Sequence, residues 1–219
     1  MDMVDFTCHK CGHLQKIPAA YIHRHGMCTN CGAPFVVEEV AHGRPGSDPD
    51  VEVLARQVSK ALDHGESVHE LMDAVTLAFF ALPECAQGGK AVLFLLDEAA
   101  GGLRLVRTRG QFSPEFLESE AFVPLGQCLC GRAAQSGQIL ICNDCFTDPR
   151  HENRWLGMKS HGHYVIPLKH GGHVTGILTV YTQAGVFADK NRLASLAALG
   201  ERIGAGIARF ARSDSLAQR

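Results

Sequence analysis

A cluster of cysteines and histidines in the second half of this 219-residue chain has the residue types and the spacing of a metal or redox site. The cluster combines two close cysteine pairs with three histidines that follow them. Its seven members are Cys128, Cys130, Cys142, Cys145, His151, His161 and His163. Thiolates and neutral imidazoles suit zinc or iron, and cysteine sets hold iron–sulfur clusters. Because close cysteine pairs also form reversible disulfides, we expect either a metal or Fe-S centre or a thiol redox switch.

The local sequence predicts how some of these side chains ionise and point. Cys130 lies in the first turn of a predicted helix over residues 130–135, where the helix dipole and nearby histidines lower the pKa of a thiol. His161 and His163 are two residues apart at the opening of a predicted strand, so we expect only one of them to face the site. Three residues outside the cluster are interpreted as structural or solvated: Cys85, His170 and His173.

A second set of cysteines lies near the N-terminus and has the spacing of a structural zinc site. Two CxxC pairs are separated by 16 residues, and their members are Cys8, Cys11, Cys28 and Cys31. Four thiolates complete a closed tetrahedron around Zn2+, and metal binding supplies the folding free energy of so short a segment. Gly12 and Gly32 directly follow the two pairs, where the chain often needs a positive φ. We therefore predict a small zinc ribbon.

The composition changes after this ribbon and divides the chain into parts. Residues 41–50 hold two glycines and two prolines among polar residues, which is typical of a linker. The predicted division is a zinc ribbon over 1–40, a linker over 41–50, a larger domain over 51–212 and a tail over 213–219.

Hydrophobic periodicity predicts the elements of the larger part. The expected helices cover 51–64, 67–82, 130–135 and 189–210, with Ser67 and Glu70 forming a capping box at the start of the second. The expected strands cover 91–96, 103–108, 138–142, 164–168 and 174–181. This order predicts an α+β fold, with helices packed on an antiparallel sheet.

The same stretch resembles a GAF domain from Ser67 to about Ala211. The matching segments are Gly131-Arg132-Ala133-Ala134-Gln135-Ser136-Gly137, Val165-Ile166-Pro167-Leu168, Gly176-Ile177-Leu178 and the closing helix. The resemblance implies a pocket between the sheet and the helix-bearing insert, where such domains bind small ligands or cofactors. The fold class expected is thus a GAF-like antiparallel sheet with flanking helices, preceded by a small zinc ribbon.

Three functions fit these features. The first is a signal-sensing regulatory protein whose GAF pocket holds a metal, an Fe-S centre or a thiol switch. The second is a binding module for a small molecule or a protein, with zinc only in the ribbon. The third is an enzyme similar to free methionine sulfoxide reductases, although the remaining pattern of that family is not evident. We expect no catalytic residues and favour the sensor.

The charge and the hydropathy of the chain limit the classes of partner that we expect it to bind. The net charge of −2, with acidic and basic residues interspersed, gives no basic face for nucleic acid. The sequence has no apolar run long enough to predict a membrane span, and its N-terminus shows no export pattern. We therefore expect a cytoplasmic protein. We expect a homodimer through the helices at 51–64 and 189–210, and a signalling partner protein.

Overall fold

The computed structural model describes residues 3–7, 14–18, 25–36, 48–65, 67–86, 89–154 and 157–217. The chain divides into two compact units, Met1–Gly46 and Ser47–Arg219, and each is described by itself.

The N-terminal unit contains two antiparallel hairpins. β1 (Met3–Thr7) pairs with β2 (Leu14–Pro18), and β3 (His25–Met27) pairs with β4 (Pro34–Val36). A hydrogen bond from the Thr29 amide to Gln15 Oε1, 2.9 Å long, ties the turn of the second hairpin to β2.

The second CxxC pair lies in the turn between β3 and β4. Cys28 is buried and Cys31 is exposed. Gly32 has the positive φ (67°) that we expected, and its amide donates to the Cys28 carbonyl at 2.9 Å. Cys8 and Cys11 lie outside the described residues, so the four-cysteine zinc site stays a prediction.

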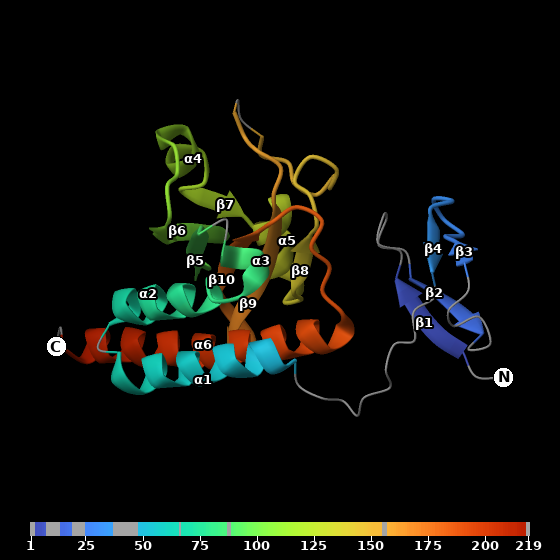
Figure 1. Ribbon diagram of the computed structural model, residues 1–219. Helices are drawn as coiled ribbons and strands as arrows, with labels where there is room; N and C mark the ends of the chain where they lie inside the picture. The colour runs from blue at the N-terminus through green and yellow to red at the C-terminus, as the bar shows by residue number, and fades with distance from the viewer. Residues whose placement is uncertain are drawn as a thin grey trace. The chain divides into compact units, whose positions relative to one another are not determined.

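The larger unit is built on a six-stranded antiparallel sheet (Figure 1). Its strands are β5 (Ala91–Asp97), β6 (Gly102–Arg109), β7 (Phe122–Pro124), β8 (Leu140–Cys142), β9 (Gly162–His170) and β10 (His173–Thr182). They lie in the order β7-β6-β5-β10-β9-β8. The central strands are buried on both faces, which explains why they read as continuous apolar runs rather than as alternating patterns.

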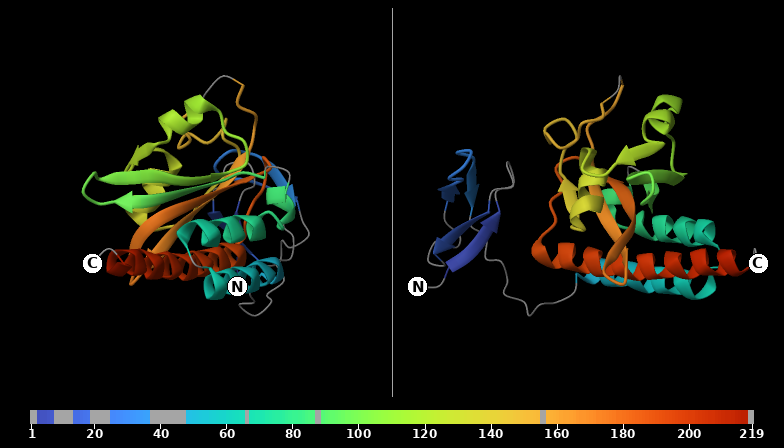
Figure 2. Two further views of the ribbon diagram at one scale, coloured as in Figure 1. Left: turned by 90° about the vertical axis from the view of Figure 1, so that its left-hand side faces the viewer. Right: turned by 180° about the vertical axis from the view of Figure 1, so that it is seen from behind.

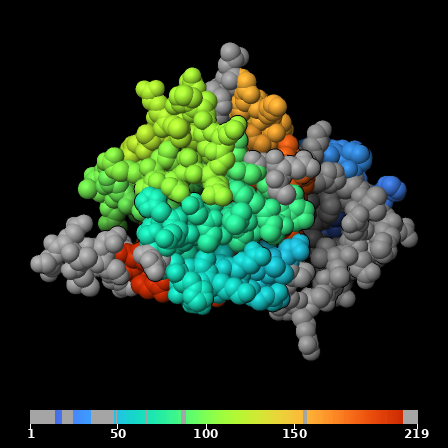
Figure 3. All heavy atoms as spheres, turned by 60° about the vertical axis from the view of Figure 1, so that its left-hand side comes forward, coloured from blue at the N-terminus to red at the C-terminus, as the bar shows by residue number. Residues whose placement is uncertain are grey.

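Three helices cover one face of this sheet. They are α1 (Pro49–His64), α2 (Val68–Phe79) and α6 (Lys190–Ala217), and the short α3 (Pro83–Ala86) follows α2. The two views of Figure 2 show this layer beneath the sheet, and Figure 3 shows α1 and α2 side by side on one face of the unit. Tyr164, Ile166 and Leu168 of β9 point into the core that these helices form with the sheet.

The opposite face of the sheet carries the shorter elements of the insert. They are α4 (Pro114–Ser119), α5 (Cys128–Ser136) and the segment between β8 and β9. The strand side chains that point to this second face, including Val165 of β9 and Val92 of β5, form a second core with α5. The sheet therefore separates a helix-covered side from an insert-covered side, and the candidate site lies on the insert side.

The predicted α+β fold is confirmed, and the differences from the sequence interpretation concern the ends of elements and some short elements that were not predicted. The expected helix over 67–82 ends at Phe79, because Pro83 disfavours a helical conformation in the residue before it. Ser67 is the N-cap of this helix, as the capping-box pattern predicted, with the Glu70 amide donating to Ser67 Oγ at 3.2 Å. The last helix continues through the predicted tail to Ala217, and α4 and β7 were not predicted. No helix in the described part of the chain combines the length and the apolar character that a membrane crossing requires.

Candidate metal centre

Three imidazole rings converge on the insert side of the sheet. One candidate ligand atom each of His151, His161 and His163 lies within 4.8 Å of the other two. The rings of His161 and His163 are 4.7 Å apart between centroids, and those of His151 and His163 are 5.1 Å apart. Tyr181 of β10 packs against both His161 and His163 and holds the pair from the side. We call these three residues the histidine cluster.

The unusual property of the histidine cluster is its unused hydrogen-bonding capacity. Four of its ring nitrogens are buried without a hydrogen-bond partner in the described part of the chain: His151 Nδ1, His161 Nε2, His163 Nδ1 and His163 Nε2. A buried polar atom that makes no hydrogen bond costs about 1–3 kcal/mol. Four such atoms in one place are therefore a large penalty unless something coordinates them.

The protonation states suit a cation. Burial lowers the pKa of all three histidines, most strongly that of His163, so the rings stay neutral with free lone pairs at neutral pH. His161 Nδ1 lies 2.5 Å from the Lys159 carbonyl oxygen and donates to it, which leaves Nε2 as the ligating atom. Tetrahedral zinc holds nitrogen ligands about 3.4 Å apart, so small side-chain rotations would close the cluster around an ion.

The prediction that only one of His161 and His163 faces the site is wrong. Successive side chains alternate between the two faces of a strand, so residues two apart share a face; His161 directly precedes β9, which begins at Gly162, and its ring lies beside that of His163. Its backbone is held by a hydrogen bond from the Cys145 amide to the His161 carbonyl oxygen, 2.8 Å long. Gly162 is needed here because a Cβ would come within 2.7 Å of the Cys142 carbonyl oxygen.

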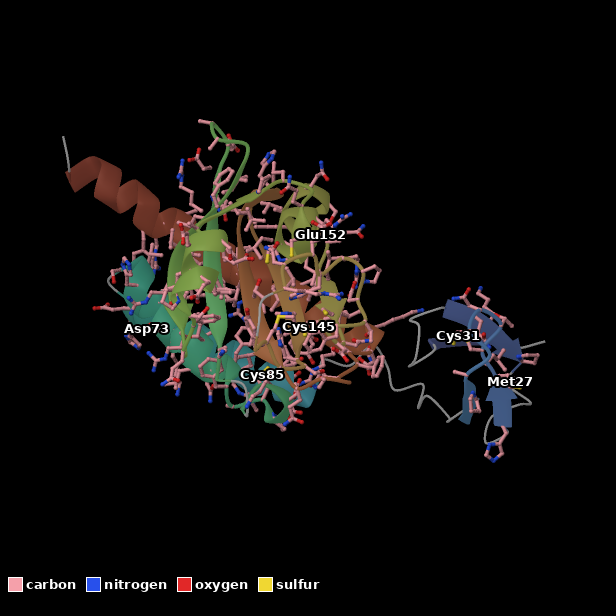
Figure 4. All side chains as sticks on the ribbon, turned by 90° about the horizontal axis from the view of Figure 1, so that it is seen from above. Met27, Cys31, Asp73, Cys85, Cys145 and Glu152 are labelled. Atoms are coloured by element: carbon pink, nitrogen blue, oxygen red, sulfur yellow. The ribbon has the colours of Figure 1, made fainter. Side chains whose placement is uncertain are left out.

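His151 is positioned by the two residues that follow it. Glu152 accepts a hydrogen bond from the Cys128 amide at 3.1 Å and pairs with Arg132 of α5 at 2.6 Å. Asn153 donates to the carboxylate of Glu120, at the end of α4. The segment that carries His151 is therefore anchored to two separate elements of the insert. Figure 4 labels Glu152 on this segment.

A small cavity adjoins the histidine cluster on its inner side. His151 and His163 line it together with Cys128 and Cys130, and its free volume is about 30 Å³. The remaining lining residues come from the sheet, α4, α5 and the segment after His151: Val92, Phe94, Phe116, Glu120, Leu129, Asn153, Val165, Thr179 and Tyr181. The pocket that the GAF resemblance implied, between the sheet and the insert, is thus present.

The start of α5 is held tightly against the neighbouring turn. Gly131 allows this because a Cβ there would lie 2.1 Å from the Pro124 carbonyl oxygen. Cys128 has a φ of 48°, the only positive φ of a non-glycine residue in the described part of the chain. Residues other than glycine rarely adopt this conformation, and such strain concentrates at functional sites.

The prediction of activated thiolates is wrong. Burial raises the pKa of Cys128, Cys130 and Cys145 and raises that of Cys142 to about 12. The helix dipole does not overcome this desolvation, and the histidines are neutral and supply no positive charge. Cys130 is a buried thiol whose Sγ lies 3.2 Å from Thr179 Oγ1.

The two cysteine pairs take different places around the histidine cluster. Cys128 and Cys130 line the cavity, whereas Cys145 Sγ lies 3.5 Å from His161 Nδ1, the ring nitrogen bonded to Lys159. Cys142 is fully buried at the end of β8, and the carboxylate of Asp148 is one cause of its raised pKa. None of these sulfurs joins the group of mutually close ligand atoms among the described residues.

Sequence reasoning missed the polar residues that complete the site. Glu120, Asn153, Thr179 and Tyr181 come from three separate places, namely the end of α4, the segment after His151 and β10, and they belong to no motif. Asn153 follows His151 closely and Tyr181 lies in the predicted strand over 174–181, but neither position carries a pattern that predicts its role. Cys85 is buried beneath the helices, as the structural interpretation expected, and His170 and His173 are exposed.

Solved structures with the same fold include both regulatory domains and enzymes. The GAF domain of a phosphoenolpyruvate-protein phosphotransferase from Coxiella burnetii superposes with a TM-score of 0.64 at 21% identity, covering 76% of this chain and 97% of that one. Free methionine-R-sulfoxide reductase from Neisseria meningitidis, in complex with its substrate, gives 0.58 at 20%, covering 77% and 95%. These likenesses show the fold.

Comparison at the level of sequence identifies the family. No curated protein sequence matches the chain significantly. A family profile described as the GAF domain matches residues 65–208, which include the whole sheet, the histidine cluster and the cavity. This protein belongs to the GAF domain family.

Proposed function

We propose that this protein is a regulatory sensor whose GAF pocket binds one transition-metal ion through His151, His161 and His163. The observation that carries the proposal is the convergence of four buried, unpartnered ring nitrogens in one cluster. A divalent ion would satisfy one nitrogen of each ring and remove most of the penalty for their burial.

The donor set favours a single ion of zinc or ferrous iron over an iron–sulfur cluster. Three neutral imidazoles suit either ion, and three protein ligands leave a coordination position open. Iron–sulfur clusters need several thiolates, whereas the sulfurs here lie outside the converging group of ligand atoms. Cys128 and Cys130 line the cavity beside the ion instead of holding it.

The remaining parts of the proposal concern the output and the ribbon. The N-terminal unit would hold a structural Zn2+ through Cys8, Cys11, Cys28 and Cys31. The long helices α1 and α6 would pass the state of the pocket to a partner protein or to a second copy of this cytoplasmic chain. The helix α6 packs on β9 on the face of the sheet opposite to the histidine cluster, and α1 packs on α6, so a displacement of β9 would reach α6 directly and α1 through it.

The test is metal analysis of the full chain purified without oxygen. We expect two ions per chain in the wild type, and one in His163→Ala and in His151→Ala. His170→Ala is the matched control, because His170 is an exposed histidine of the same strand, and it should keep both ions. Cobalt substitution adds a second readout: the intense sulfur-to-cobalt band of the four-cysteine ribbon should keep its intensity in His163→Ala, since nitrogen ligation at the histidine cluster gives no such band. Equal metal content in His163→Ala and the wild type would refute the assignment.

A methionine sulfoxide reductase activity is the second candidate, favoured by the fold shared with the Neisseria enzyme and by the thiols that line the cavity. It requires a reactive thiolate, and burial raises the pKa of both Cys128 and Cys130. Thiol-dependent turnover of free methionine sulfoxide by the wild type, lost in Cys128→Ser, would establish this function in place of the sensor.

A further inference from the structure

Glu120 is a buried acidic residue that lines the same small cavity as two members of the histidine cluster. It directly follows α4, it is 6% exposed, and His151 and His163 line the cavity beside it. No other aspartate or glutamate, and no lysine or arginine, lines this cavity in the described part of the chain. The Glu120 carboxylate accepts a hydrogen bond from the Asn153 side chain. Glu120 is therefore a buried acid without a cationic partner among the described residues.

Such a group costs stability as long as no positive charge lies near it. Burial raises the pKa of the Glu120 carboxyl group, although the hydrogen bond from Asn153 opposes this shift. Removing a carboxylate from water without a counter-charge is unfavourable. Perturbed titratable groups of this kind concentrate at functional sites. A cation bound close to Glu120 would turn the cost into a favourable interaction.

The charge of Glu120 acts on residues that surround the histidine cluster. Burial raises the pKa of Cys128 and of Tyr181, and the Glu120 carboxylate is a further cause of both shifts. Cys128 lines the cavity, and Tyr181 packs on the rings of His161 and His163. A field that disfavours a negative thiolate or phenolate favours a positive ion in the same place.

A divalent ion in the histidine cluster would lack a counter-charge among its own ligands. Neutral imidazoles contribute no charge, so the centre would keep both positive charges of the ion. Two of the three ligands, His151 and His163, are only 7% and 4% exposed. Because an unpaired charge is costly to bury, a carboxylate close to the centre would raise the affinity of the cluster for the ion.

Two other carboxylates act on the cluster, those of Asp144 and Asp148, but neither has an uncompensated buried charge. Asp148 is paired with Arg150 at 2.6 Å, and this pairing cancels most of its charge. Asp144 is partly exposed, so water screens its charge. Glu120 is the acid whose burial and lack of a cationic partner match an ion in the cluster.

We propose that Glu120 is the counter-charge of the metal centre and that it strengthens metal binding across the cavity without being a ligand. This inference rests on the proposed function and names a further residue of the same site. Glu120 has no atom in the group of mutually close ligand atoms, so its effect on the ion is electrostatic. The hydrogen bond from Asn153 adds a second link, because Asn153 lies two residues after His151. Groups next to metal ligands typically change metal affinity about 10- to 100-fold.

The experiment measures the affinity of the histidine cluster for Co2+ in the full chain, after one equivalent of Zn2+ has been added to fill the four-cysteine ribbon. The ligand-field absorption bands of cobalt report the binding. Glu120→Gln keeps the size of the side chain and can still accept the hydrogen bond from Asn153, but it carries no charge. We expect it to bind Co2+ about 10- to 100-fold more weakly than the wild type. Glu118→Gln is the matched control, because it removes the same charge from an exposed position of α4 and should keep the wild-type affinity.

Two further readouts separate a counter-charge from a structural role. Glu120→Asp keeps the negative charge on a side chain one methylene shorter, and we expect it to recover most of the affinity that Glu120→Gln loses. Azide is a small anion that can bind cobalt at an open coordination position. Without the nearby carboxylate the centre attracts anions more strongly, so Glu120→Gln should bind azide at lower concentrations than the wild type and Glu118→Gln do. If Glu120→Gln does not fold, Glu120→Ala removes the same charge and should give the same two results.

Equal cobalt affinity in Glu120→Gln and the wild type would overturn the inference and leave the metal centre standing. The same holds if Glu120→Asp binds cobalt as weakly as Glu120→Gln, or if the azide affinity of Glu120→Gln does not rise, because Glu120 would then act only through the fold. A wild type that binds no Co2+ at the histidine cluster overturns both this inference and the proposed function.

Discussion

His163 and Tyr164 are consecutive residues of β9, and their side chains lie on opposite faces of the sheet. His163 belongs to the histidine cluster, whereas Tyr164 is buried beneath the helices. The Tyr164 hydroxyl donates to Glu84 Oε1 at 2.8 Å, and Glu84 also pairs with Arg192 of α6. Arg192 reaches Asp48 at 3.1 Å, and Asp48 caps the start of α1. The candidate metal centre is thus one residue away from a polar network that joins α3, α6 and the beginning of α1.

Removal of the Tyr164 hydroxyl should weaken this network without touching the metal centre. A hydrogen bond to a charged partner contributes about 1.5–3 kcal/mol, so Tyr164→Phe should lower the free energy of unfolding by about 2 kcal/mol. Urea denaturation measures the change, and metal content should stay that of the wild type. Thr175→Val is the control, because it removes a hydrogen bond to the Leu168 carbonyl on the neighbouring strand and should cost about 1 kcal/mol. A loss of metal in Tyr164→Phe would contradict the separation of the two faces.

Replacement of Arg192 should be far more costly. Its side chain is only 15% exposed and faces Asp48 and Glu84, which are each 14% exposed. Arg192→Met leaves two carboxylates without their cation, and breaking a buried pair costs about 3–5 kcal/mol. Arg104→Met is the matched control: its pair with Asp97 is 2.6 Å long, but Arg104 is 60% exposed, and surface pairs contribute about 0–1 kcal/mol. Similar urea midpoints for the two variants would show that the network contributes little.

The sequence predicted the architecture better than it predicted the site. Hydrophobic periodicity and turn glycines predict the main helices and strands, so the order of these elements follows from the local sequence pattern alone. The cysteine–histidine segment was also found from its composition. The arrangement within it was not predicted: residues two apart in a strand share a face, against the expectation for His161 and His163, and His151 reaches them from the separate segment between β8 and β9.

The ionisation state of the cysteines in the site could not be predicted from the local sequence either. Cys130 follows the pattern of an activated thiol at a helix start, yet burial raises its pKa and outweighs the hydrogen bond with Thr179, which acts in the opposite direction. Burial is set by strands that are distant in the sequence. Glu120 and Asn153 were missed for the same reason, since 33 residues separate the two partners.

The buried carboxyl group of Glu120 should make stability depend on pH in an unusual direction. Burial raises its pKa above the ordinary value of 4.5, although the hydrogen bond from Asn153 opposes this shift. The folded protein then holds the proton more tightly than the unfolded chain, so this group destabilises the fold as pH rises from about 4.5 through the folded-state pKa. Glu120→Gln removes the effect and should gain stability relative to the wild type as pH increases over that window.

Urea denaturation at a series of pH values measures this difference, and all other titrating groups cancel between the two proteins. Glu115→Gln is the control, because hydrogen bonding lowers the pKa of the exposed Glu115 and its pH dependence should run in the opposite direction. A Glu120→Gln variant whose stability relative to the wild type does not change between pH 4 and pH 8 would show that Glu120 is solvated in the folded protein.

Thiol reactivity separates a metal sensor from a disulfide switch. Burial raises the pKa of Cys85 and of Cys142 to about 12, so at pH 8 roughly one thiol in ten thousand is ionised, against about a quarter for a thiol of ordinary pKa. Because the thiolate is the reactive form, both residues should be alkylated by iodoacetamide at least about 100-fold more slowly in the native protein than in urea. Peptide mass spectrometry of the metal-free full chain measures the alkylation rate of each cysteine in the native protein and in urea. Cys85 serves as the reference, because it is a buried thiol that does not line the pocket. If Cys142 reacts much faster than Cys85, or forms a disulfide with Cys145 under mild oxidation, the segment after β8 opens readily and a thiol switch becomes the better account of this site.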